Sequence, residues 1–552
     1  MIRNPILPGF NADPSIVRVG DDYFIATSTF EWYPGVQIHH SRDLVNWQLR
    51  TRPLARASQL DLRGNPDSCG VWAPCLSHAN GRFWLVYSDV KRKDGNFKDV
   101  HNYLVTADSI DGPWSDPVYL NSSGFDPSLF HDEDGRKWLV NLVWDHRIKP
   151  SKFGGILLQE YDANARQLVG PVCNIFGGSP LGLTEGPHLY RRNGWYYLMT
   201  AEGGTGYRHA VTMARSRTLE GPYALHPDWH VLTSRHHAEL RLQRAGHGDF
   251  VQTQHDEVYL VHLASRPYPG LLRSPLGRET SIQKVEWGTD DWLRLAGKPL
   301  EPLDEVPAPA LPEHRFLPEA TRHDFDVPVL PLAFQWLRTP YPERLFSLTE
   351  RPGHLRLFGR ESVGSWFEQA LLARRQTSFN CMAETMLDYA PQNYQQLAGL
   401  VAYYNRYQFH YLAVTFDPEI GRCLTILSCP ADWPDGRLVF PLADPVPLPG
   451  EGPVRLRLEI TQIQLQFSYA LDSASWCRIG PALDAMILSD EAGQGESGNF
   501  TGAFVGMCAN DMTGSALQAD FDYFEYQDLE GAGQCDYCQE DMMMYGDKLR
   551  TC

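Results

Sequence analysis

A unit that recurs five times within about the first 300 residues constrains this chain more than any other feature of its sequence. Each unit has a short acidic or proline-containing strand start, and an aromatic-rich strand follows about ten residues later. The aromatic-rich strands cover residues 23–26, 83–87, 137–140, 195–198 and 258–262. Because a period of roughly 55–65 residues built only from strands is typical of radial repeats, the pattern predicts a β-propeller.

The segments that open the units contain three carboxylic acids, Asp13, Asp126 and Glu185, at positions that the repeat predicts to be equivalent. In a propeller the innermost strand of each blade begins near the central axis, so these side chains should meet although they are distant in sequence. A single Asp-Pro pair is weak evidence for a catalytic acid, because aspartate at such turns often binds local backbone N–H groups. The three acids together predict an active site on the axis.

The repeats end near residue 287, and the chain then changes character. We expect a propeller over residues 1–297 and a linker over 298–321, whose prolines should keep it out of any sheet. Residues 322–528 are predicted to form a β-sandwich, since 454–461 alternates strictly and 412–416 and 521–526 look similar. The tail, 529–552, is expected to be mobile, because its one Cys-x-x-Cys pair is weak evidence for a metal site. We find no long amphipathic helix, so the chain is predicted to be all-β.

Composition narrows the set of partners. A formal charge of −18 argues against nucleic acid and against an anionic membrane, whereas a small neutral substrate meets no such repulsion. The sequence has no apolar run near the length of a membrane span and no recognisable leader. Its 11 cysteines are odd in number and lack framework spacing, so we read them as reduced thiols and expect a cytoplasmic protein.

Three carboxyl groups on one axis suit the hydrolysis of a glycosidic bond. That reaction needs an acid to protonate the leaving oxygen and a second carboxylate to act as base or nucleophile. The acid must stay uncharged at the working pH, which requires burial or a neighbouring carboxylate to raise its pKa. A third carboxyl group could tune and orient the acid.

Five segments carry a family resemblance: NADPSI at 11–16, STFEWYPGV at 28–36, VWAP at 71–74, GFDPSL at 124–129 and LTEGPH at 183–188. They resemble glycoside hydrolase family 43, in particular its two-domain β-xylosidases. That resemblance runs from about residue 3 to about residue 527. It implies a five-bladed propeller followed by a concanavalin- or jelly-roll-like sandwich. It also implies an inverting exo-hydrolase that releases D-xylose from the non-reducing end of β-1,4-xylo-oligosaccharides, with side activity on α-L-arabinofuranosides.

The resemblance assigns a role to each acid. Asp13 would be the general base that activates water, and Glu185 would be the general acid. Asp126 would modulate the pKa of the acid and hold the sugar. An inverting enzyme needs room for a water molecule, which sets the two carboxyl groups about 6.5–9.5 Å apart.

The same resemblance predicts the walls of the sugar pocket. Arg278 would offer a forked donor to sugar hydroxyls and a charge near the carboxylates. Aromatic residues beside strands are usually core, but here three of them would stack on the sugar. A loop of the second domain would close the pocket and so limit cleavage to one terminal sugar. The predicted substrate-binding residues are Phe30, Trp72, Ala73, Trp144, Thr205, His247, Arg278 and Phe500.

The chemistry requires no cofactor. In some relatives the residue equivalent to His247 helps to hold a central ion or water, so a Ca²⁺ ion near His247 is compatible with the sequence, although a lone histidine is more often a core residue. Relatives often form dimers or tetramers, and the resemblance therefore implies a homo-oligomer.

Three other readings compete with a β-xylosidase. A member of the same family could act mainly as an α-L-arabinofuranosidase, because the two sugars present similar hydroxyls. Sucrose- and fructan-cleaving propellers use a retaining mechanism and an Arg-Asp-Pro motif, which this sequence lacks. A non-catalytic sugar-binding propeller would be favoured by loss of one of the acids, and all three are present.

Overall fold

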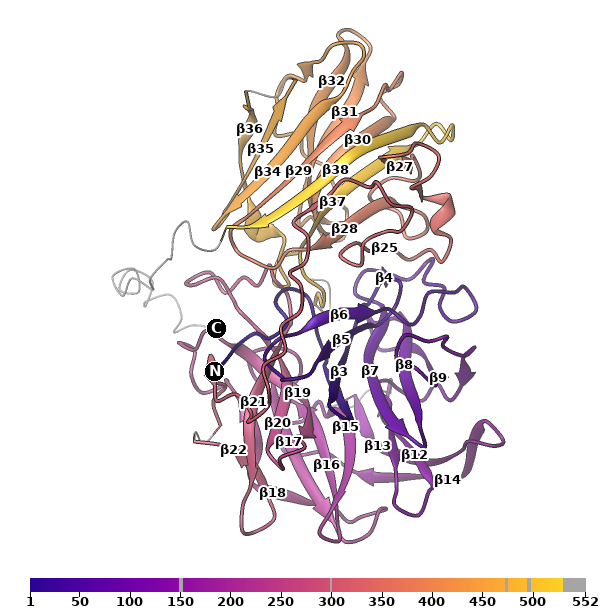
Figure 1. The fold of residues 1–552 in the computed structure, drawn as a ribbon, viewed down its shortest axis with the longest axis vertical. Helices are drawn as coiled ribbons and strands as arrows, with labels where there is room; N and C mark the ends of the chain where they lie inside the picture. The colour runs from indigo at the N-terminus through magenta and orange to yellow at the C-terminus, as the bar shows by residue number, and fades with distance from the viewer. Residues whose placement is uncertain (148–151, 298–299, 472–474, 494–497, 530–552) are drawn as a thin grey trace.

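The computed structural model describes residues 1–147, 152–297, 300–471, 475–493 and 498–529. Two β domains follow one another along the long axis of the molecule (Figure 1). Within the described ranges the helical elements are two single 3-10 turns, η1 (Pro342–Arg344) and η2 (Ala485–Ile487). The all-β prediction is therefore confirmed. No helix of the described chain is long and apolar enough to cross a membrane. The predicted tail lies outside the described residues from 530 onwards.

The first domain is a five-bladed propeller, and each blade is a four-stranded antiparallel sheet. The first three blades are β2 (Ser15–Val19), β3 (Asp22–Thr27), β5 (Gln37–Ser41) and β6 (Gln48–Thr51); β7 (Gly70–Ala79), β8 (Arg82–Arg92), β9 (Asp99–Ala107) and β10 (Val118–Tyr119); and β11 (Ser128–His131), β12 (Lys137–Trp144), β13 (Phe153–Asp162) and β14 (Gln167–Phe176). The last two are β15 (Glu185–Arg192), β16 (Trp195–Glu202), β17 (Ala210–Ser216) and β18 (Ala224–Thr233); and β19 (Gln243–Gln252), β20 (Val258–Ser265), β21 (Glu279–Trp287) and β22 (Leu293–Leu295).

The predicted aromatic-rich segments are the second strands of the five blades, β3, β8, β12, β16 and β20. Aromatic rings from these blades pack against their neighbours. Phe24 meets Phe83 edge-on at 5.6 Å between the first two blades, and Tyr197 of β16 lies 4.9 Å from Trp287 of β21 between the last two. The repeat of aromatic residues thus reflects repeated packing between blades, where large rings fill the space between twisted sheets.

The second domain is a sandwich of two antiparallel sheets. One contains β26 (Phe346–Ser347), β27 (Leu355–Phe358), β38 (Gln518–Asp528), β29 (Cys381–Asp388), β34 (Val454–Thr461), β35 (Gln464–Ala470) and β36 (Cys477–Asp484), with β24 (Arg322–His323) paired to β38. The other contains β28 (Ala370–Arg375), β37 (Phe504–Asp511), β30 (Gln396–Asn405), β31 (Gln408–Asp417), β32 (Gly421–Pro430) and β33 (Val446–Pro447). All three strands predicted in this region are present, within β34, β31 and β38.

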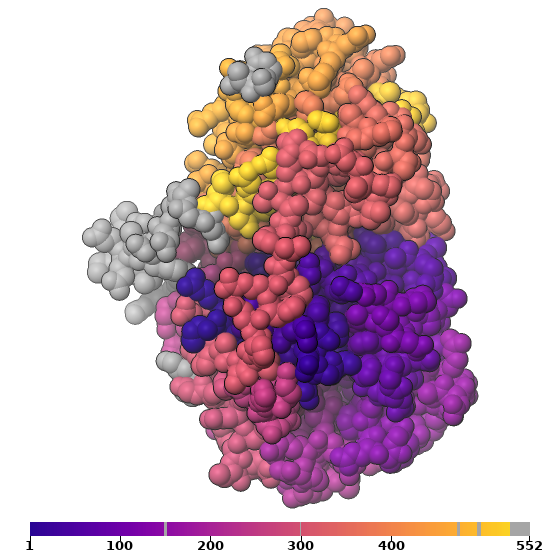
Figure 2. Space-filling view, viewed as in Figure 1, coloured from indigo at the N-terminus to yellow at the C-terminus, as the bar shows by residue number. Residues whose placement is uncertain are grey.

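The segment after the propeller runs across the surface of the first domain and up to the second (Figure 2). We expected its prolines to keep it out of a sheet, and this was wrong at one place. The non-proline residues of β23 (Glu305–Val306) pair with β1 (Ile2–Arg3), because both retain their backbone N–H groups.

The two domains are also joined by a short sheet and a ring stack. Strand β4 (Trp32–Tyr33) of the propeller pairs with β25 (Trp336–Leu337), which lies between β24 and β26 of the second domain. Trp32 stacks on Phe504 of β37 with 3.6 Å between ring centroids. These contacts hold the sandwich against one face of the propeller.

Candidate active site

The three predicted acids, which come from the first, third and fourth blades, line one pocket of about 240 Å³. Phe500, from the loop that leads into β37 of the sandwich, lines the same pocket. Seven of the eight predicted substrate-binding residues are therefore brought together: Phe30, Trp72, Trp144, Thr205, His247, Arg278 and Phe500. The exception is Ala73. Its backbone N–H donates to Oγ of Ser28, so it lies behind the acids and does not line the pocket.

The backbone at the axis repeats in all five blades. Within the first half of each inner strand, or two residues before it, one residue has a positive φ: Asp13 (54°), Ala73 (29°), Asp126 (53°), Gly186 (55°) and His247 (44°). Four of these residues precede a proline. Asp13 and Asp126 are thus equivalent, as predicted, but the equivalent residue in the fourth blade is Gly186. Glu185 lies one residue earlier, so its side chain leaves the backbone from a different position than those of the two aspartates.

Asp13 is held as a carboxylate. Oδ1 accepts a hydrogen bond from Nη1 of Arg278 at 3.0 Å, and Oδ2 accepts one from the Ser28 hydroxyl at 2.7 Å. Burial alone would raise the pKa of Asp13, but the Arg278 charge and the Ser28 hydrogen bond lower it below its usual value. At neutral pH this group is an ionised base.

Glu185 has the opposite electrostatic environment. Burial raises its pKa, the nearby Asp13 charge raises it further, and the positive charges of Arg278 and Lys98 oppose the shift, which leaves the pKa at about 7. Glu185 can therefore carry a proton at neutral pH. A buried carboxyl group that stays protonated is the requirement for a general acid.

Asp126 is also held towards its neutral form. Burial and the charges of Glu185 and Asp13 raise its pKa well above the usual value. One oxygen accepts the backbone N–H of Gly186 at 3.0 Å. The protonated group can offer a hydrogen-bond donor to a sugar. Because the repulsion between Asp126 and Glu185 acts on both groups, the predicted roles of Asp126 in modulating the acid and in holding the sugar both stay predictions.

Aromatic rings surround the acids. Trp72 meets Phe125 edge-on at 5.2 Å and Phe500 edge-on at 5.7 Å, and Phe30 lies 6.1 Å from Phe500. Arg278 ties the sandwich loop to the base, because its Nη2 donates to the Phe500 carbonyl at 3.0 Å while its Nη1 bonds Asp13. The second domain thus supplies both a ring and a carbonyl to the pocket.

His247 packs closely over the fourth blade. A Cβ at Gly186 would lie 2.8 Å from its Nε2, so this position requires glycine. Burial lowers the pKa of His247 to about 4, although Asp13, 3.6 Å from Nδ1, opposes the shift. In the described chain no group of three or more His, Cys, Asp or Glu side chains is arranged to hold a metal ion. A Ca²⁺ ion near His247 therefore stays a prediction from the resemblance alone.

Sequence reasoning missed four residues that line the pocket: Lys98, Phe125, Leu183 and Gly204. Lys98 matters most, because its Nζ lies 4.4 Å from the centroid of Trp144 and its charge lowers the pKa of Glu185. It belongs to a charged stretch between the second and third strands of its blade, which reads as a solvated loop. The sequence did offer a signal for Phe125 as a pocket residue, since it directly precedes Asp126.

An ionised carboxylate and a protonated carboxyl group that face one small aromatic-walled pocket define the active site of a glycoside hydrolase. Comparison with known proteins agrees. Residues 2–293 match the glycosyl hydrolases family 43, and residues 322–527 match the β-xylosidase C-terminal concanavalin A-like domain. The chain belongs to glycosyl hydrolase family 43.

Similar proteins cover nearly the whole chain. The xylosidase/arabinosidase 43B of Humicola insolens is 60% identical over 96% of this chain and 98% of its own length. A β-xylosidase of Bacillus subtilis is 50% identical over 96% and 99% of the two chains. The crystal structure of a xylan β-1,4-xylosidase from Bacillus halodurans C-125 has a TM-score of 0.93 and 53% identity, and covers 96% of this chain and all of its own.

Proposed function

We propose that this chain is an inverting exo-β-xylosidase that releases D-xylose from the non-reducing end of β-1,4-xylo-oligosaccharides. The observation that carries the proposal is the separation of two pKa values in one pocket: that of Asp13 is lowered, and that of Glu185 is raised to about 7. The evidence that the sugar is xylose comes from the similar proteins that are named xylosidases.

In the proposed reaction Asp13 takes a proton from a water molecule, and that water attacks the anomeric carbon. Glu185 donates its proton to the glycosidic oxygen as the bond to the leaving sugar breaks. Asp13 ends protonated and Glu185 ionised, so exchange of protons with solvent resets the site. Arg278 keeps Asp13 ionised and oriented through the 3.0 Å hydrogen bond.

The size and closure of the pocket support an exo mode of action. A volume of about 240 Å³ lies below the roughly 300–1,000 Å³ typical of pockets for drug-sized ligands, which suits one sugar unit. Phe500 and Arg278 join the two domains across its wall. A chain end can enter such a pocket, whereas the middle of a polymer cannot.

The experiment is a proton NMR time course of xylobiose hydrolysis. We expect D-xylose whose first-formed anomer at the cleaved position is α, the inverted configuration. A β anomer formed first would contradict the inverting mechanism. Failure to cleave xylobiose would favour the sugar-binding alternative.

Side activity on α-L-arabinofuranosides is part of the proposal, and the Humicola relative is named a xylosidase/arabinosidase. Rates on 4-nitrophenyl β-D-xyloside and 4-nitrophenyl α-L-arabinofuranoside separate the two assignments. A large preference for the arabinofuranoside would make this chain mainly an arabinofuranosidase. A homo-oligomeric state and a cytoplasmic location stay predictions.

A further inference from the structure

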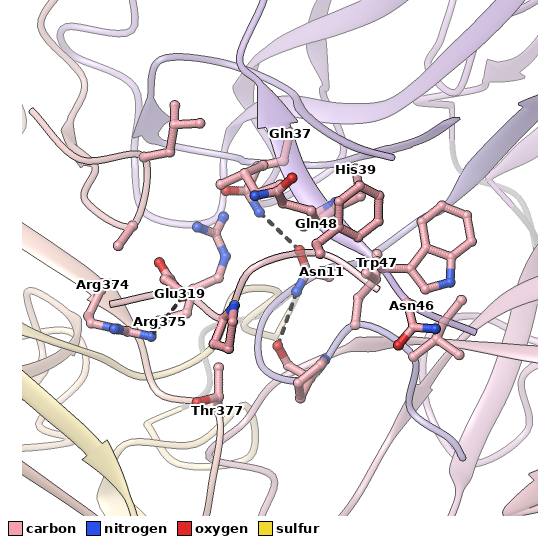
Figure 3. A pocket seen from close by; sticks show the side chains of 18 of the residues that line it. Asn11, Gln37, His39, Asn46, Trp47, Gln48, Glu319, Arg374, Arg375 and Thr377 are labelled. Atoms are coloured by element: carbon pink, nitrogen blue, oxygen red, sulfur yellow. Dashed lines mark hydrogen bonds and ion pairs between the residues drawn. The ribbon is translucent and has the colours of Figure 1, made fainter. Parts of the chain in front are cut away.

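A second and larger cavity, of about 690 Å³, lies between the two domains. Strands β5 and β6 of the first blade, the linker around residues 316–319 and the end of β28 in the sandwich surround it (Figure 3). None of its described lining residues also lines the carboxylate pocket. The cavity exists only when both domains are folded against one another.

Two buried arginines in this cavity lack an acidic partner. The exposed fraction of Arg52 and of Arg375 is 8% each. Arg52 donates to Oε1 of Gln37 and to one carbonyl, and Arg375 donates to Oε1 of Gln335 and to the Phe10 carbonyl. Within the described chain neither forms an ion pair, and Nη2 of Arg375 has no hydrogen-bond partner.

The other buried arginines in the described ranges are neutralised or fully bonded. Arg422 donates all three nitrogen atoms to backbone carbonyls. The remaining four pair with carboxylates: Arg244 with Asp490 at 3.0 Å, Arg266 with Glu279 at 2.6 Å, Arg278 with Asp13 at 3.0 Å and Arg338 with Asp67 at 2.8 Å. Arg52 resembles Arg422 in that all three of its nitrogen atoms donate to neutral acceptors. Arg375 stands apart through its unpartnered Nη2, and these two arginines line one cavity together without a compensating charge.

Two further side chains of the cavity have unpaired nitrogen atoms, and one of them, His39, is neutral because burial and the charges of Arg375 and Arg52 lower its pKa to about 3. Nδ1 of His39 and Nε of Arg374 also lack hydrogen-bond partners among the described residues. The acid in the cavity is Glu319, which is exposed at the rim and lies 3.4 Å from Arg374. Burial lowers the pKa of Arg52 to about 9 despite Glu319, and burial and then Arg52 lower that of Arg375. Unpaired buried charges are costly, and an anion would remove that cost.

The wall opposite the arginines is suited to a polyhydroxylated molecule. Asn46, Trp47 and Gln48 lie there, across the cavity from Arg374 and Arg375 (Figure 3). Amide groups exchange hydrogen bonds with hydroxyls, and an indole presents a flat apolar face. The volume lies within the roughly 300–1,000 Å³ range of small-molecule sites.

We propose that this interdomain cavity binds a sugar acid or a sugar phosphate, whose carboxylate or phosphate group lies against Arg52 and Arg375. The forked guanidinium groups match the two oxygens of either anion. The rest of the ligand fills the space towards Trp47. This site is separate from the site of hydrolysis.

Isothermal titration calorimetry on the full chain tests the proposal with three probes that share one ring: D-glucose, D-glucuronate and D-glucose 6-phosphate. We expect saturable binding of at least one of the two anions and none of glucose. The anion that binds identifies the carboxylate or the phosphate as the recognised group. Because binding is measured without turnover, the result is independent of the proposed xylosidase activity.

Two variants locate the site. Arg52→Met and Arg375→Met should each weaken anion binding at least about tenfold, the size expected for losing a hydrogen bond to a charged group. Arg166→Met, an exposed arginine on the third blade, should bind as the wild type does. If circular dichroism shows that Arg375→Met does not fold, Arg52→Met decides. Absence of binding to the wild type up to about 10 mM, equal binding of glucose, or full binding by folded Arg52→Met overturns the proposal.

Discussion

Asp13 and Glu185 are both buried carboxyl groups, yet their neighbours give them opposite protonation states. Asp13 receives hydrogen bonds from a guanidinium group and a hydroxyl. For Glu185 the causes that raise its pKa, burial and the Asp13 charge, outweigh the positive charges of Arg278 and Lys98. The chemistry thus depends on which side chains meet each acid, and less on the acids themselves.

Leaving-group dependence distinguishes the two acids. Glu185→Gln should lower kcat on xylobiose by about 10²–10⁴-fold, the usual contribution of a general acid. The loss should be much smaller on 2,4-dinitrophenyl β-D-xyloside, because that leaving group departs without a proton. Asp13→Asn should lose similar activity on both substrates. If instead Glu185→Gln lost similar activity on both substrates and Asp13→Asn lost much less on the dinitrophenyl substrate, the roles of acid and base would be exchanged.

The elements that bring these residues together are the inner strands of the propeller and one loop of the sandwich. Each inner strand has a residue of positive φ within its first half or two residues before it. The loop before β37 crosses to the propeller, where the backbone N–H of Phe500 donates to Oγ of Ser68 at 3.0 Å.

Gly186→Ala tests the requirement for glycine at the axis. Its Cβ would lie 2.8 Å from Nε2 of His247 at a φ of 55°, so we expect loss of stability and of activity. Gly20→Ala is the matched control, because Gly20 has a φ of 63° but no atom within 4 Å of the added Cβ. The control should cost only about 1 kcal/mol in urea unfolding. Equal costs for both variants would remove the steric argument.

Phe500→Ala tests the sandwich loop. Loss of one ring from the pocket should lower kcat/KM on xylobiose roughly 2–12-fold, which corresponds to about 0.5–1.5 kcal/mol for an aromatic contact. The exposed Phe440 of the sandwich provides the control, and Phe440→Ala should leave the kinetics unchanged. If both variants behave alike, the sandwich has no part in catalysis.

The whole molecule depends on an interface that contains buried charges. Arg338, which directly follows β25, donates to the Asn65 carbonyl at 2.7 Å and pairs with Asp67 of the propeller at 2.8 Å. Its exposed fraction is 0%. Because the active site takes residues from both domains, the stability of this interface is also a condition for activity.

Arg338→Met should destabilise the protein by up to about 3–5 kcal/mol, since it removes the buried partner of Asp67 and leaves that carboxylate with Arg406 alone, at 3.4 Å. Differential scanning calorimetry measures the change, and we expect a lower Tm. Arg437→Met breaks an exposed pair with Asp432 and should change stability by less than about 1 kcal/mol. An unchanged Tm in Arg338→Met would show that the interface does not depend on this pair.

Sequence patterns located the blades well because aromatic packing between blades recurs at a fixed period. The Asp-Pro pairs identified Asp13 and Asp126 for the same reason, since each marks the same turn. Phe500 was found only through the family resemblance, because nothing local distinguishes it from a core phenylalanine. Lys98, and the cavity around Arg52 and Arg375, escaped prediction because distant segments create them: Arg52 and Arg375 are joined only when the propeller meets the sandwich.

The pH dependence of kcat/KM for 4-nitrophenyl β-D-xyloside, measured for the wild type and for Lys98→Met, tests the assignment of base and acid most directly. Activity requires Asp13 ionised and Glu185 protonated, so it should fall as the pH rises through about 7. Removing the Lys98 charge should raise the pKa of Glu185 and move this alkaline limb to higher pH. An alkaline limb that stays in place or moves to lower pH in Lys98→Met would contradict Glu185 as the proton donor.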